Sequence, residues 1–123
     1  MNDKTIWKAG EDEAIKFLMD LGHTILERNW RAGHLEIDII SYDSSGIHFV
    51  EVKSRKSPIG YSPEECVNKQ KQRNITSAAK KYIRTNKNKI TDVEYHFDII
   101  AIIFSTTGSK IRYFEDAWLP IYT

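Results

Sequence analysis

The spacing of apolar and polar residues along this chain predicts two helices and five strands. Apolar residues three or four positions apart mark the helices, and alternating or β-branched runs mark the strands. The expected elements are a helix at 4–21, strands at 24–30, 36–42 and 47–54, a helix ending near 85, and strands at 93–104 and 110–118. The second helix has two candidate starts, because Ser62 opens a capping-box sequence and Asn68 offers a later N-cap.

This order of elements predicts the fold class. Three strands, a crossover helix and two more strands favour one sheet covered by helices. The chain has 123 residues, with no repeat and no linker, so we expect one domain over residues 1–123. The expected fold is α/β, a central mixed five-stranded sheet flanked by helices in the order α-β-β-β-α-β-β.

The first helix is expected to bury one apolar stripe against the sheet. The stripe consists of Ile6, Trp7, Ala14, Phe17, Leu18 and Leu21. Glu11 lies just beyond its edge and is the helix carboxylate best placed to point along the sheet. Its spacing alone favours an ordinary glutamate at the boundary of the interface.

The strand at 47–54 carries two charges inside an apolar run. Glu51 and Lys53 share one face of it with Phe49, while Val50 and Val52 fill the other. A strand that is apolar on both faces is typical of a buried position, where charges must be paired or bind a metal. This strand is therefore the first candidate for a functional site.

The hairpin that precedes this strand supplies a partner for Glu51. If Tyr42 and Ile47 close the loop, Asp38 lies directly opposite Glu51, and Glu36 lies opposite Lys53. Opposed side chains have Cβ atoms about 5 Å apart, so the two carboxylates repel unless a cation lies between them. Carboxylate oxygens suit Mg²⁺ or Mn²⁺.

The second helix combines a basic stripe with one lysine on its other face. The net charge of +1 hides this, because no Asp or Glu occurs between Cys66 and Thr91. The stripe consists of Lys69, Arg73, Lys80, Arg84 and Lys87, with Thr76 and Ser77 between them. It is compatible with an ordinary solvated face or with a surface that follows a phosphate backbone. Lys71 falls on the inward face, where it would need an acidic partner, but a helix that begins near Asn68 would equally let its side chain extend outward to solvent.

These residues could hydrolyse phosphodiesters. A metal ion held by Asp38, Glu51 and the backbone carbonyl of Val52 would polarise the phosphate and acidify a water. Lys53 could orient that water and offset the charge of the transition state. Glu11 or Glu36 would allow a second metal ion. The alternative is a buried carboxylate–lysine network without catalysis.

The same residues carry a resemblance to known proteins. Asp38 followed by Glu51-Val52-Lys53 resembles the signature of the PD-(D/E)xK nuclease superfamily, although Ile37 replaces the proline. Nearly the whole chain resembles the YraN-like family of small bacterial proteins. The matching residues are Gly10-Glu11, Ala14, Leu18, Gly22, Asn29-Trp30-Arg31, Glu36-Ile37-Asp38, Phe49 to Lys53, Arg55, Val67, Lys71, Ala79 and Phe97-Asp98. His96 departs from the pattern, where an arginine is expected.

The resemblance implies a restriction endonuclease-like fold with Glu11, Asp38, Glu51 and Lys53 as the site. Together with the residues above, it makes a Mg²⁺-dependent nuclease or nuclease-like protein the leading expectation, acting on DNA in preference to RNA, with branched DNA as one candidate substrate. Junction-cutting enzymes need two sites, so a homodimer is a further expectation. Two rival functions stay open, a catalytically silent nucleic-acid-binding module and an adaptor for another protein.

The remaining features concern the cellular compartment and the roles of the histidines and Asp98. A single cysteine, no apolar leader and no run of about 18 apolar residues predict a cytoplasmic protein without a membrane helix. His23, His34, His48 and His96 show no spacing typical of a zinc site. Asp98 is expected to support Arg31 or a helix end.

Overall fold

The computed structural model describes residues 3–56, 67–86 and 92–120, and the elements follow in the predicted order. They are α1 (Asp3–Asp20), β1 (Thr24–Ala32), β2 (Leu35–Asp43), β3 (Gly46–Lys56), α2 (Lys69–Thr85), β4 (Tyr95–Ser105) and β5 (Gly108–Phe114). Within these three ranges, neither helix is apolar enough over sufficient length to cross a membrane.

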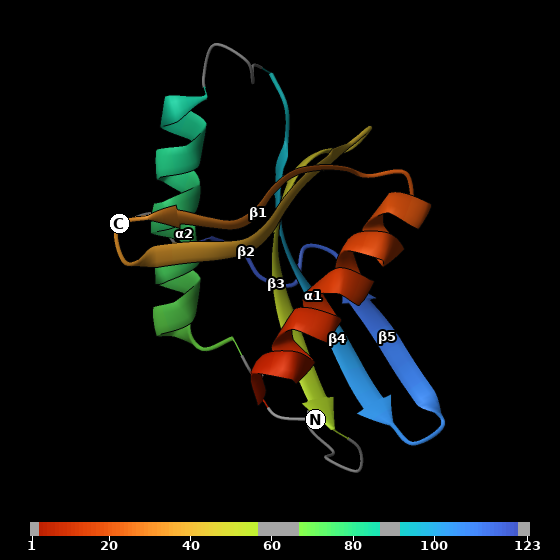
Figure 1. Ribbon diagram of the computed structural model, residues 1–123. Coiled ribbons are helices and arrows are strands. Elements are labelled where there is room, and N and C mark those ends of the chain that lie inside the picture. The colour runs from red at the N-terminus through yellow and green to blue at the C-terminus, as the bar shows by residue number, and fades with distance from the viewer. Residues whose placement is uncertain (1–2, 57–66, 87–91, 121–123) are drawn as a thin grey trace.

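The five strands form one mixed sheet in the order β1-β2-β3-β4-β5. β3 and β4 run parallel, joined by the crossover that contains α2, and the other neighbours are antiparallel. The two helices cover opposite faces of the sheet (Figure 1). The predicted α/β class, the mixed five-stranded sheet and the element order are confirmed.

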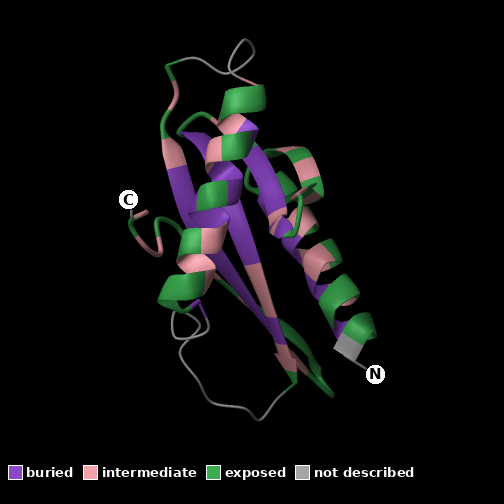
Figure 2. Ribbon diagram, turned by 90° about the vertical axis from the view of Figure 1, so that its left-hand side faces the viewer, coloured by how far each residue is buried: buried purple, intermediate pink, exposed green. Residues whose placement is uncertain are grey.

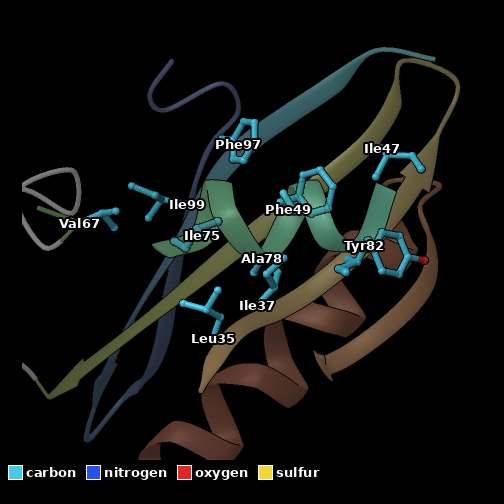
Figure 3. Close-up of a cluster of buried hydrophobic side chains, with 12 residues drawn as sticks. Leu35, Ile37, Ile47, Phe49, Val67, Ile75, Ala78, Tyr82, Phe97 and Ile99 are labelled. Atoms are coloured by element: carbon cyan, nitrogen blue, oxygen red, sulfur yellow. The ribbon is translucent and has the colours of Figure 1, made fainter. Parts of the chain in front are cut away.

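The sheet has a hydrophobic cluster on each face. The cluster beneath α2 brings Phe49 and Phe97 against Tyr82 and Ile75 of the helix (Figure 3). The cluster beneath α1 joins Ala14 and Leu18 to Ile39, Val50, Ile100 and Ile102. The central strands are therefore buried on both faces (Figure 2), as the strand at 47–54 predicted.

The buried face of α1 is narrower than its apolar residues suggested. Ile6, Gly10, Ala14 and Leu18 are buried at intervals of four residues. Trp7 and Leu21 keep 58% and 54% of their surface exposed, so their place in the predicted stripe is wrong. The contact line runs through a glycine and an alanine because the helix lies close to β3, which leaves no room beneath it for a large side chain.

The start of α2 and the end of β5 can be compared with the boundaries that the sequence predicted. Asn68 caps α2 by accepting a hydrogen bond from the Lys71 backbone N–H at 2.8 Å, which supports the later start. The capping-box sequence at 62–65 lies outside the described residues. β5 ends at Phe114 rather than at 118, because Asp116 adopts a positive φ of 52° and Ala117 N–H then bonds to Phe97 O.

Candidate active site

The two strands of the β2–β3 hairpin are paired near the turn and separate farther from it. Its ladder runs from the Asp43–Gly46 pair to the Ile39–Val50 pair, in the predicted register, and stops there. Ile40 packs beneath α2 and Ile39 beneath α1, yet Ile37 is again on the α2 side, so strict alternation is lost around residue 38. β1 and β2 then leave β3 (Figure 1). The predicted Asp38–Glu51 and Glu36–Lys53 pairs both lie beyond the ladder, and Glu36 pairs instead with Arg31 at 3.3 Å.

A cleft of about 360 Å³ lies where β2 and β3 separate. It is lined by Trp7, Glu11, Glu36, Asp38, Glu51, Val52, Lys53, Ser54, Arg55 and Lys71. All four predicted catalytic residues, the predicted ligand Val52 and the inward Lys71 thus face one space. They come from both helices and from the two strands that separate.

Asp38 is held beside Glu51 by the backbone of β3. Its Oδ2 accepts a hydrogen bond from Val52 N–H at 2.9 Å. Burial, and after it the charge of Glu51, raises the pKa of the Asp38 carboxyl well above its usual range. The Val52 hydrogen bond and Lys71 offset only part of this effect. A cation between the two carboxylates would relieve the cost of ionising Asp38.

Glu51 is paired with lysines from two elements. Its side chain is 6% exposed, and its Oε1 lies 3.6 Å from Nζ of both Lys53 and Lys71. A buried carboxylate requires such partners. The expectation that Lys71 meets an acidic group is confirmed. Lys53 is 19% exposed, so its ammonium is within reach of a molecule that enters the cleft.

Glu11 is fixed by β1, a contact that the sequence did not reveal. Its Oε1 accepts hydrogen bonds from Asn29 Nδ2 at 3.1 Å and from Arg28 Nη2 at 3.4 Å, and Arg28 also reaches Asp12 at 2.7 Å. Asn29 has a positive φ of 52°, which asparagine tolerates better than most residues. An asparagine inside a strand pattern was the available signal. Glu11 therefore lines the cleft with its carboxylate held in a fixed orientation.

Gly10 allows α1 to place Glu11 there. A Cβ added at Gly10 would lie 1.8 Å from Ser54 Oγ and 3.0 Å from Ser54 Cβ, and Ser54 is buried. We expect Gly10→Ala to destabilise the protein by about 1–3 kcal/mol through overpacking, despite the higher helix propensity of alanine. Chemical denaturation measures this.

Ser54→Ala in the same chain provides the matched control, because it removes the closest atom. The double variant should recover part of the lost stability. Gly10→Ala that leaves stability unchanged would contradict the close approach of α1 to β3.

The basic residues of α2 are only partly arranged as predicted. Lys69, Arg73 and Arg84 are exposed and Lys80 is half-buried, while Lys87 lies outside the described residues. Thr76, expected to fill the stripe, is instead buried, and its hydroxyl donates to Gln72 O at 2.8 Å. The first turn of α2 adjoins the cleft through the Lys71–Glu51 contact.

Comparison with known proteins places the chain among relatives of similar length. The family model described as uncharacterised protein family UPF0102 matches residues 10–102, a range that includes every residue of the cleft except Trp7. A UPF0102 protein of Dictyoglomus thermophilum is 42% identical over 108 residues, covering 88% of this chain and 90% of the relative. A UPF0102 protein of Clostridium kluyveri is 40% identical over 118 residues, covering 94% and 95%.

One solved structure shows a weaker likeness. SfsA of Pyrococcus furiosus, in complex with Ca²⁺, aligns with a TM-score of 0.41 and 16% identity over 93% of this chain and 64% of that chain. A likeness at that level carries no argument about function.

Proposed function

This chain belongs to the UPF0102 family, the YraN-like family that its sequence resembles, and on that footing we propose that it is a metal-dependent DNA nuclease. The observation that carries the proposal is the convergence of Asp38 and Glu51 in one cleft, with Lys53 and Lys71 against Glu51. Two nearby acids and a lysine beside them suit a divalent cation and an anionic substrate.

Each residue has a separate task in this proposal. Asp38, Glu51 and the Val52 carbonyl would hold Mg²⁺ or Mn²⁺, which when bound supplies Lewis acidity to the phosphate and lowers the pKa of a water. Lys53 orients the attacking water and offsets the negative charge that develops on the phosphate. Glu11, fixed by Asn29, is available for a second ion. The Val52 N–H bond keeps Asp38 oriented before any ion binds.

The test is cleavage of branched, duplex and single-stranded DNA, and of RNA, with Mg²⁺ or Mn²⁺ and with a chelator. We expect metal-dependent cleavage of DNA, lowered about 10²–10³-fold by Lys53→Ala because one donor to the developing charge is lost. Lys56→Ala is the matched control, since Lys56 is an exposed lysine of the same strand that does not line the cleft. Cleavage that survives the loss of Lys53 would overturn the mechanism.

The exposed basic residues of α2 supply the substrate-binding surface in this proposal. We expect the double variant Arg73→Ala with Arg84→Ala to weaken binding of any DNA sequence. It should also reduce the slope of log affinity against log salt by about 2, one for each phosphate contact. Fluorescence anisotropy at several salt concentrations measures both effects.

Lys4→Ala with Lys16→Ala removes the same charge from exposed positions of α1 and should leave the slope nearly unchanged. Equal effects of the two double variants would mean that α2 is not the binding surface.

The same surface supports a second candidate function, a nucleic-acid-binding module that does not cut. Exposure of Lys69, Arg73 and Arg84 outside the cleft favours it, because these residues need no metal to hold phosphate. Salt-sensitive binding without cleavage under every metal condition would select this module. Absence of both would select an adaptor role. Sedimentation with and without DNA would test the expected homodimer.

A further inference from the structure

Three of the four histidines meet near the turn of the β2–β3 hairpin, away from the cleft. His48 comes from β3, His96 from β4, and His23 from the connection between α1 and β1. The ring of His48 lies 4.6 Å from that of His23 and 4.5 Å from that of His96, centroid to centroid. Positions 23, 48 and 96 form no local motif, so the spacing of the histidines along the chain did not predict this cluster.

Two of these histidines converge on one carboxylate. Nε2 of His23 lies 3.3 Å from Oδ2 of Asp43, and Nε2 of His48 lies 2.9 Å from Oδ1 of the same residue. One ligand atom from each residue fits within 4.8 Å of the other two. In a tetrahedral zinc site with bonds of about 2.0–2.2 Å, neighbouring donors are about 3.3–3.5 Å apart, so the three donor atoms would have to shift by about 1.5 Å or less relative to one another when the ion binds.

The other ring nitrogen of each histidine already has a partner. Nδ1 of His23 is 2.9 Å from Ser41 Oγ, and Nδ1 of His48 is 2.6 Å from Asp98 Oδ2. Asp98 is itself held by hydrogen bonds from Tyr113 OH and from Asp116 N–H. Partners of this kind orient histidine ligands and raise their basicity in known metal sites. Both Nε2 atoms thereby face Asp43, and that of His48 also lies 3.0 Å from Ser45 Oγ.

We propose that His23, Asp43 and His48 form a Zn²⁺ site separate from the acidic cleft. Two imidazole nitrogens and one carboxylate suit Zn²⁺ better than Mg²⁺, and a water completes the fourth position. The ion would join the segment after α1 to the turn of the hairpin, two regions 20 residues apart in sequence. Asp43 has the most exposed side chain of the three, at 21%, and marks the way in from solvent.

Calorimetric titration with Zn²⁺ tests this in a Cys66→Ser background, which removes the only thiol of the chain. We expect one Zn²⁺ per chain and an unfolding midpoint that rises with Zn²⁺ concentration, because the ion binds the folded state. His23→Gln and Asp43→Asn should each weaken binding by at least about 100-fold, more than the loss of a supporting partner costs. Asp43→Asn retains the oxygen that accepts from Ser45 N–H, so its hairpin turn should stay folded.

Two control variants separate this site from the rest of the chain. His34→Gln changes an exposed histidine and should bind Zn²⁺ like the parent, while Asp38→Asn disables the acidic cleft and should keep the Zn²⁺ that the histidines hold. No saturable binding by the parent, or unchanged binding by both His23→Gln and Asp43→Asn, would overturn the proposal. Loss of binding in Asp38→Asn would assign the ion to the cleft and overturn it equally. The cleavage assay is independent of these results.

Discussion

Asp38→Asn is expected to lower metal-dependent cleavage about 10³-fold or more while making the metal-free protein more stable. Polarisation by a bound cation supplies several kcal/mol of transition-state stabilisation, and the amide is a poor ligand for it. The hydrogen bond from Val52 N–H survives, because the amide oxygen of asparagine still accepts it. Single-turnover cleavage and thermal unfolding with a chelator measure the two effects.

The gain in stability should depend on pH in one direction. The pKa of Asp38 is raised in the folded state, first by burial and then by Glu51, so ionising it costs the native protein stability. That cost is absent below the ordinary carboxyl pKa of about 3.9 and grows as pH rises through the raised value. Asp38→Asn should therefore gain on the order of 1 kcal/mol near neutral pH and nothing in acid.

Asp20→Asn is the matched control for this pair of effects. Asp20 is an exposed carboxylate at the end of α1 that does not line the cleft. We expect small changes in both measurements. If Asp38→Asn cleaved DNA as fast as the parent, Asp38 would not be a metal ligand. If Asp38→Asn were less stable than the parent at neutral pH, the predicted cost of ionising Asp38 beside Glu51 would be refuted.

Much of this site could be predicted because its two central strands are adjacent in sequence. A two-residue turn and the alternation of side chains fix which residues oppose each other from Asp43–Gly46 to Ile39–Val50, and Asp38 and Glu51 follow directly after the last pair of this ladder. Helical periodicity likewise placed Lys71 on the side of α2 that faces the sheet, where its ammonium reaches Glu51 although the side chain stays 41% exposed. Patterns of this kind depend only on neighbours in the chain.

The rest depended on contacts between distant segments. The end of the ladder at Ile39–Val50, which opens the cleft, reflects how β1 and β2 pack over α2, and no local pattern encodes it. The same is true of Asn29, which fixes Glu11 from another element. Trp7 has helical spacing suited to burial yet is exposed, because the approach at Gly10 decides which face meets the sheet.

The contacts of Asp98 differ most from those that the sequence predicted. Removal of its side chain should have the largest effect on the free energy of unfolding. The prediction that Asp98 supports Arg31 or a helix end is wrong. Asp98 is 1% exposed and accepts hydrogen bonds from His48 Nδ1 at 2.6 Å, from Tyr113 OH and from Asp116 N–H. Burial alone would lower the pKa of His48, but hydrogen bonds to Asp98 and Asp43 raise it.

Asp98→Ala should therefore cost about 3–5 kcal/mol, because it leaves a fully buried imidazolium with one carboxylate fewer and a buried phenol without its acceptor. Denaturant unfolding at pH below the His48 pKa measures it. Asp98→Asn should cost less, since an amide oxygen can still accept one of the three bonds, and exposed Asp20→Ala should change stability by no more than about 0.5 kcal/mol. If Asp98→Ala were as mild as Asp20→Ala, the network joining β3, β4 and β5 would have no role in holding the sheet, and the tertiary contacts of Asp98 would be incidental.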